Sequence, residues 1–225
     1  MPTGSRRISA RIRSIRKIMK SAFIALCFSV LTLLPFGVSA NGPAPDELIG
    51  ELCEEVVEIL RTNKPARSGD TAGTVRLVQE AVLPHFNFRR MTMLAVGRDW
   101  RSATPEQQKR LTDAFYGMLT RTYSNALTQY RDQTVAVRPS RVDPSEKTAR
   151  VQTEIQQPGG QPISVDYVLE LRPDGWKIFD IVVAGVSLVT NYRGTFAREI
   201  SLGGIDGLID SLETKERLVA RATQS

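Results

Sequence analysis

Ser187 is the residue of this chain whose surroundings come closest to those of a catalytic nucleophile. It lies in the run Gly185-Val186-Ser187-Leu188-Val189, between an apolar segment and a segment with helical spacing. A nucleophile elbow requires Gly-x-Ser-x-Gly, because both glycines relieve crowding at a strained turn. Here Val189 replaces the second glycine, and the single histidine, His85, precedes the serine although the base of such hydrolases follows it. The pattern favours Ser187 as a helix N-cap that accepts from the amides near Val189 and Thr190.

Other groups that could build an active site are sparse. A single histidine argues against a multi-histidine metal site, and Gly203-Gly204 lacks the Lys-Ser/Thr that a phosphate-binding loop requires. We interpret His85 as a structural residue, and Asp180, among apolar neighbours in a strand, as facing solvent or pairing with an arginine. We therefore expect no enzyme, no metal and no cofactor, with an exported serine esterase that uses Ser187 and His85 as the alternative.

Residues 1–40 have the layout of a secretory signal peptide. Basic residues without an acidic one precede an apolar run from Ala22 to Phe36, and Val38-Ser39-Ala40 forms a small-x-small ending. The apolar run is too short for a regular membrane span, although an uncleaved anchor stays open. We expect cleavage after Ala40, export to the periplasm and one mature domain over 41–225, with Met19 as an alternative start of the same signal.

The charge of the chain changes once this segment is removed. The full chain has 30 Lys+Arg and 24 Asp+Glu, for a net charge of +6. Seven of the basic residues precede residue 41, which leaves 23 basic against 24 acidic residues. The basic character therefore belongs to the export segment, and we expect no nucleic-acid partner. The mature chain keeps one cysteine, Cys53, and thus no internal disulfide.

Apolar residues at helical spacing predict helices on both sides of a central block. Thr104-Pro105-Glu106-Gln107 opens the longest one with a capping box, and Gly97 ends the short helix before it. Asn63 to Asp70 is expected to be a loop. The predicted helices run over 46–60, 74–83, 86–96, 104–130, 188–200 and 205–220, and Gly203-Gly204 separates the last two.

Alternation of apolar and polar residues predicts four strands in the central block. Short turn-like links join them, and such links connect antiparallel neighbours. We therefore predict an α+β fold, in which helices cover one face of a four-stranded antiparallel sheet and enclose an apolar pocket. The strands are expected around 135–137, 151–155, 163–171 and 176–183. The polar face of the sheet carries Arg150, Gln152, Glu154, Asp166 and Glu170.

Seven short motifs occur in order between residues 83 and 212. They are Leu83-Pro84-His85-Phe86, Gly97-Arg98-Asp99-Trp100-Arg101, Thr104-Pro105-Glu106-Gln107, Val165-Asp166-Tyr167, Trp176-Lys177-Ile178-Phe179-Asp180, Val186-Ser187-Leu188-Val189 and Asn191-Tyr192-Arg193. Together they resemble the MlaC family of periplasmic phospholipid carriers, also called toluene-tolerance proteins. Asn87 departs from the family pattern, which usually has aspartate there, so an electrostatic contact made by that acid is expected to be absent.

The resemblance implies that the chain shuttles phospholipid and so maintains the lipid asymmetry of the outer membrane. The implied partners are an outer-membrane lipoprotein–porin complex and an inner-membrane ABC transporter with an MCE-domain protein. Hopanoid-associated members share the pattern, so a hopanoid or other lipid carrier of the same fold stays open.

The implied cargo site is a pocket for acyl chains between the sheet and the helices. Arg193, Arg98 or Arg101 could meet a phosphate at its mouth. Each apolar candidate could equally be a core residue, since a cavity wall and a core share one composition. The candidate lining residues are Met91, Leu94, Phe115, Met118, Leu119, Tyr123, Val151, Ile155, Val165, Tyr167, Leu169, Ile181, Val183, Val186, Leu188, Tyr192 and Arg193.

Overall fold

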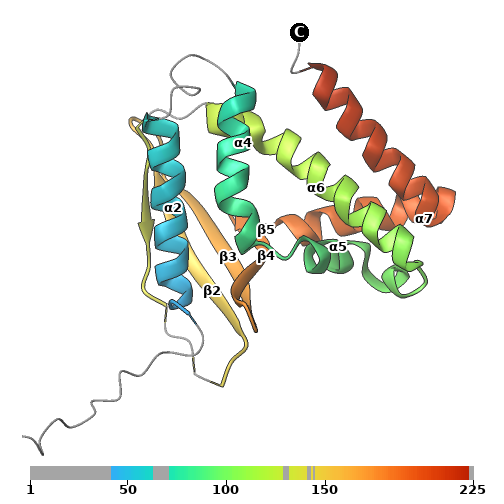
Figure 1. Ribbon diagram of the computed structural model, residues 1–225, viewed down its shortest axis with the longest axis horizontal. Helices are drawn as coiled ribbons and strands as arrows, with labels where there is room; N and C mark the ends of the chain where they lie inside the picture. Colours follow the sequence, from blue (N-terminus) through green and yellow to red (C-terminus); the bar gives the residue numbers. More distant parts are fainter. Residues whose placement is uncertain (1–41, 63–70, 129–131, 141–142, 144, 223–225) are drawn as a thin grey trace, which may run out of the picture. The chain divides into compact units, whose positions relative to one another are not determined.

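The computed structural model describes residues 42–62, 71–128, 132–140, 143 and 145–222 (Figure 1). The predicted signal peptide, with its alternative start at Met19, and the predicted loop over 63–70 lie outside these residues. Within the described part of the chain, every helix is too short or too polar to cross a bilayer.

Helices precede and follow a central block of strands, as the periodicity predicts. They are α2 (Pro45–Thr62), α4 (Thr71–Val82), α5 (Phe88–Val96), α6 (Pro105–Thr128) and α7 (Leu188–Ala222), with 3-10 turns over Leu83–His85 and Gly97–Arg101. Inside α7, Gly204 has a non-helical φ of 69°, which places a kink where two separate helices were predicted.

The local signals at the helix ends are confirmed. The Thr104 N–H donates to Gln107 Oε1 at 3.0 Å, and the Gln107 N–H donates to Thr104 Oγ1 at 3.2 Å, which completes the capping box of α6. Gly97 ends α5 with a φ of 72°, a value that favours glycine. The helix predicted from residue 86 begins at Phe88, because the side chain of Asn87 caps it by accepting from the Arg90 N–H.

The strands form one antiparallel sheet in the order β1-β2-β3-β4-β5. They are β1 (Thr134–Val137), β2 (Thr148–Gln156), β3 (Ile163–Arg172), β4 (Gly175–Val183) and β5 (Val186–Ser187). The predicted meander is confirmed, and β5 is an additional strand. It forms because Ala184 and Gly185 both have positive φ, 48° and 82°, so the chain reverses in a two-residue turn.

The apolar face of the sheet lies against α2. Ile49 and Leu52 of α2 are buried in one cluster with Val151, Leu169 and Ile178 of the sheet, which we call the sheet core. Figure 1 shows α2 and α4 in front of the strands. α2 forms the predicted helical layer over the apolar face, and Val82 at the end of α4 packs against the sheet core.

The remaining helices build a second cluster beside β4, which we call the helical core. It contains Met91 of α5, Phe115 of α6, and Phe196 and Ile209 of α7. Phe86 packs against both clusters. Figure 1 shows α5, α6 and α7 to the side of α2 and α4, so the single layer of the prediction is an oversimplification.

Two acidic residues on the polar face are more buried than predicted. Asp166 and Glu170 are 7% and 6% exposed, although alternation placed both on the polar face. Asp166 is ion-paired with Arg150 at 3.3 Å, and Glu170 is ion-paired with Arg90 of α5. Paired carboxylates can be buried at a tolerable cost.

The backbone of the turn between β4 and β5 is strained at Ala184, and a substitution can relieve this strain. Ala184 has a left-handed φ of 48°, which costs an L-residue other than glycine or asparagine about 1–2 kcal/mol. Ala184→Asn creates an Asn-Gly pair, the favoured sequence of such turns. We expect the free energy of unfolding, measured by urea denaturation, to rise by about 1 kcal/mol. Ala136→Asn, in β1 with its side chain exposed, is the control and should lower stability. A loss in Ala184→Asn would contradict the strain.

Candidate functional site

Ser187 caps α7, as predicted. Its Oγ accepts from the Thr190 N–H at 3.0 Å and donates to Asp180 Oδ2 at 2.6 Å. Asp180 Oδ1 accepts from the Val189 N–H at 3.1 Å. The prediction that Asp180 faces solvent or pairs with an arginine is therefore wrong. Its carboxylate is a second cap, placed where the N-terminal amides of a helix favour negative charge.

Several of the candidate lining residues are completely enclosed. Met91, Phe115, Met118 and Leu119 belong to the helical core, while Val151 and Leu169 belong to the sheet core, with Tyr167 and Ile181 packed against it. Val165 is also buried. Leu94 and Tyr192 pack against the helical core, and Leu188 is half-buried at the start of α7. In this structure most of the enclosed residues belong to the two hydrophobic cores.

Val183 and Val186 are exposed, and Ile155 is half-buried, at one end of the apolar face. The register pairs Val165 with Val183, and Val183 with Val186. Ile155 pairs with Ile163 one row further along. Ile163 and Val183 are each 36% exposed and Val186 is 56% exposed. We call Ile155, Ile163, Val183 and Val186 the apolar sheet end.

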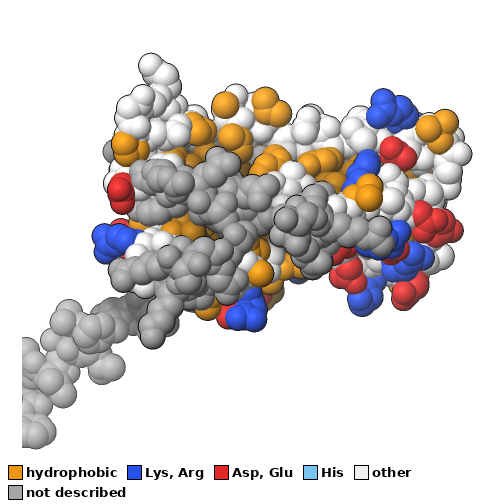
Figure 2. Space-filling model, turned by 90° about the horizontal axis from the view of Figure 1, so that it is seen from above, with side chains coloured by type: hydrophobic (Ala, Val, Ile, Leu, Met, Phe, Trp, Pro, Cys, Tyr) orange, Lys and Arg blue, Asp and Glu red, His pale blue; other side chains and the backbone are white. Residues whose placement is uncertain are grey.

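Contiguous exposed apolar surface is a feature of binding sites. The sequence prediction missed Ile163, although its place in the alternation of β3 would have identified it. Tyr123, at 42% exposure, is a further exposed candidate from α6. Figure 2 shows hydrophobic side chains in the middle of the face seen from above, and most of the charged ones toward one end.

Polar groups beside these apolar residues stay uncharged at neutral pH. Burial raises the pKa of the Cys53 thiol and of the Tyr167 hydroxyl, whose sulfur and oxygen lie 3.9 Å apart. Burial, together with the neighbouring Tyr123 hydroxyl, raises the pKa of Tyr192 to about 12. These groups offer hydrogen bonds without charge.

The predicted phosphate-binding arginines have other surroundings. Arg193 Nε and Nη2 donate to the carbonyl oxygen of Leu94 at 3.0 and 2.9 Å, which satisfies a carbonyl in the last turn of α5. Arg98 Nε lies 3.9 Å from Asp99 Oδ1, and Arg101 is exposed. The structure thus gives Arg193 a positioning contact, and a role in binding phosphate remains a prediction for all three.

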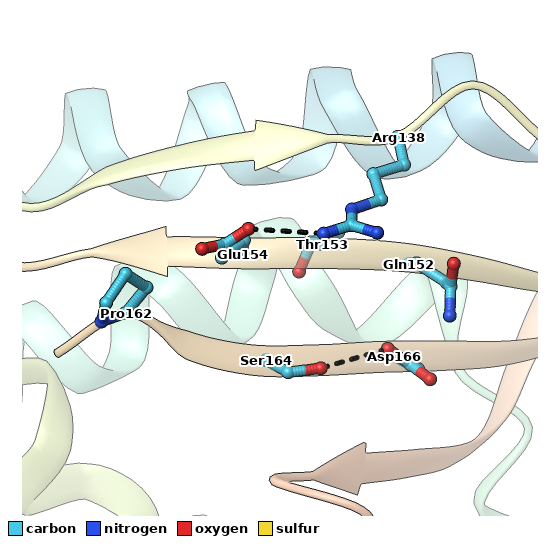
Figure 3. Close-up of a pocket in the computed structure, with 7 residues that line it drawn as sticks. All are labelled: Arg138, Gln152, Thr153, Glu154, Pro162, Ser164 and Asp166. Carbon is cyan, nitrogen blue, oxygen red and sulfur yellow. Dashed lines mark hydrogen bonds and ion pairs between the residues drawn. The ribbon is translucent and has the colours of Figure 1, made fainter.

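A polar pocket of about 270 Å³ lies on the opposite side of the sheet from α2 (Figure 3). Arg138 and Glu154 form an ion pair across it at 3.5 Å, and the Ser164 hydroxyl contacts Asp166 at 3.4 Å. The third charged lining residue, Asp166, is ion-paired with Arg150, which lies outside the lining. Among the described residues, no group of His, Cys, Asp and Glu could hold a metal ion. The lining residues are Arg138, Gln152, Thr153, Glu154, Pro162, Ser164 and Asp166.

Comparison with known proteins identifies the family. The family described as MlaC protein matches residues 51–214. The chain belongs to the MlaC family. It is 32% identical over 125 residues to toluene tolerance protein ttg2D of Pseudomonas putida, in an alignment that covers 56% of this chain and 57% of that protein. It is 21% identical over 198 residues to the intermembrane phospholipid transport system binding protein MlaC of Haemophilus influenzae, covering 87% of this chain and 92% of that one.

A solved structure has the same fold. It is the phospholipid-binding protein from Ralstonia solanacearum in complex with a phospholipid, with a TM-score of 0.74 and 33% identity. The match covers 79% of this chain and 99% of that chain. The resemblance inferred from the seven motifs, and the α+β fold that it implied, are confirmed.

The cap at Ser187 can be tested by two substitutions. Ser187→Ala removes the acceptor of the Thr190 N–H, and we expect the free energy of unfolding to fall by about 1 kcal/mol. Ser187→Asn keeps an acceptor at the N-cap and should retain most of that stability. Equal losses in the two variants, measured by thermal denaturation, would show that the hydroxyl does not act as a cap.

Proposed function

We propose that this protein is a periplasmic phospholipid carrier of the Mla pathway that holds acyl chains against its apolar sheet end. The observation that carries the proposal is the exposure of Ile163, Val183 and Val186 in adjacent rows of one sheet face. The similarity to a protein solved in complex with a phospholipid supports it. Hydrocarbon tails are the cargo whose chemistry matches this surface.

The energetics of burial suit a carrier that needs no chemistry of its own. Burying one acyl CH₂ contributes about 0.8 kcal/mol, so two chains of about sixteen carbons gain on the order of 20 kcal/mol relative to water. A bilayer offers a similar gain. Transfer between the carrier and a membrane is therefore close to balanced, and the direction of transport comes from the partners.

The residues that would contact the chains extend from the apolar sheet end toward the two cores. The partly exposed candidates Ile155, Val183, Val186 and Tyr123 lie first in the path of an entering chain. The buried candidates, such as Val165 and Phe115, would line the pocket only after the helices and the sheet separate. The head group stays at the mouth, within reach of solvent.

The proposed location and partners follow the family. The segment over 1–40 would direct export to the periplasm, leaving a mature domain from residue 41. The carrier would exchange lipid with an outer-membrane lipoprotein–porin complex and with an inner-membrane ABC transporter that bears an MCE-domain protein. Similarity to the intermembrane phospholipid transport system binding protein MlaC of Haemophilus influenzae supports exchange of lipid between two membranes.

The proposal includes the absence of enzyme activity. The Ser187 hydroxyl donates to a carboxylate, Asp180 Oδ2 at 2.6 Å, and it accepts from a helix amide, whereas an activated serine donates to a general base such as histidine. We expect no covalent labelling of the protein by a fluorophosphonate probe. Labelling that disappears in Ser187→Ala would favour the exported serine esterase.

Bound lipid is the direct test of the function. We expect protein purified from the periplasm of cells that express the full chain to retain phospholipid in native mass spectrometry. Val186→Asp places a charge among the apolar rows and should reduce the retained lipid about tenfold or more, since an unpaired charge against hydrocarbon is costly.

The matched control is another exposed apolar residue. Leu202, 81% exposed at the kink of α7, lies outside the apolar sheet end, so Leu202→Asp should retain lipid as the wild type does. A wild-type protein without lipid would contradict the function. Equal retention in Val186→Asp and the wild type would contradict the location of the site.

A further inference from the structure

A buried carboxylate joins the sheet to α5. Glu170 of β3 is 6% exposed and accepts from Asn87 Nδ2 at 2.6 Å. It also forms an ion pair with Arg90 Nη1. The Asn87 side chain therefore makes two hydrogen bonds, because its oxygen also accepts from the Arg90 N–H at 3.0 Å and so caps α5.

The guanidinium of Arg90 is held from a second side. Its carbon lies 3.9 Å from the ring centroid of Phe179. The register of β3 and β4 shifts at this point, with Val168 opposite Asp180 and Leu169 opposite Ile178, so Phe179 is the extra residue of a β-bulge. Bulges re-aim side chains, and here the bulge supplies the ring on which Arg90 packs. Cation–π contact and charge together fix the position of Arg90.

This cluster lies where the two cores meet. The Asn87 N–H donates to the Ile178 carbonyl at 2.8 Å, and Phe86 forms a bridge with Ile178 while it packs against both cores. The apolar sheet end lies on the sheet, whereas Tyr192 of α7 packs against the helical core. We call the sheet and the helices of the helical core the two walls. The angle between these two walls therefore depends on how α5 is fixed to β3 and β4.

We infer that Arg90 and Glu170 are positioning residues that hold the two walls together and so set the rate at which the protein exchanges its cargo. The inference rests on the proposed function. Breaking one partner leaves a buried charge unpaired and favours separation of α5 from the sheet. The apolar surface that holds the chains is unchanged, so the exchange rate changes more than the amount of lipid bound.

The experiment measures transfer of a fluorescent phospholipid from loaded protein to phosphatidylglycerol-containing vesicles. Glu170→Gln keeps an acceptor for Asn87 and removes the charge, whereas Arg90→Lys keeps the charge and loses the planar stack on Phe179. We expect both variants to release lipid about tenfold faster than the wild type, as the loss of a charged hydrogen bond permits.

The control is an ion pair between α6 and α7, two helices that contribute to the helical core. Arg110 Nη2 of α6 contacts Glu213 Oε1 of α7 at 3.0 Å, so Glu213→Gln breaks a pair without loosening α5 from the sheet. Its release rate should equal that of the wild type when both are compared at the same interval below their melting temperatures. Hydrogen exchange should accelerate at the Asn87 amide in Glu170→Gln and not in Glu213→Gln.

The possible failures are distinguishable. If the wild-type protein takes up no phospholipid, the proposed function and this inference both fail. If the wild type carries lipid but Glu170→Gln and Arg90→Lys release it no faster than Glu213→Gln, the positioning role alone is overturned. An equal increase of the release rate in all three variants would show that lost stability causes the effect, and it would also overturn the positioning role.

Discussion

The apolar face of the sheet is longer than the part of it that helices cover, and the rest of the structure depends on this difference. Apolar residues alternate along the full length of β2, β3 and β4, but α2 buries only the part around Val151, Leu169 and Ile178. The rows at the other end, which include Val183 and Val186, remain exposed. Exposed apolar rows cost free energy in water, and the cost is removed when hydrocarbon covers them.

This arrangement suits the proposed binding of hydrocarbon. The polar neighbours of the apolar region, such as Tyr167 and Cys53, have pKa values raised by burial and stay neutral at neutral pH. A cargo held by hydrocarbon contacts alone can leave without breaking a covalent bond or an ion pair. The ion pair of Arg90 with Glu170 then acts on the protein walls and not on the lipid.

How far the sequence predicts this structure depends on the distance along the chain over which each interaction acts. The Thr104–Gln107 capping box and the glycine at residue 97 are local signals, and both were predicted correctly. The cap from Asp180 reaches nine residues along the chain, across the turn between β4 and β5. The ion pair of Glu170 with Arg90 joins residues 80 positions apart, so no local pattern shows it. Alternation identifies the apolar face, but only the three-dimensional structure shows which end of that face α2 leaves exposed. The strand β5 was not predicted, because two residues are too few to show an alternation.

The contact between hydrocarbon and the apolar sheet end can be measured directly by methyl NMR. A phospholipid with a nitroxide on its acyl chain broadens the methyl signals within its reach. The account predicts strong broadening for Ile163, Val183 and Val186, and little for Leu208 in the helical core. Broadening of Leu208 with sharp signals from Val183 and Val186, or no broadening of any of these methyls, would contradict it.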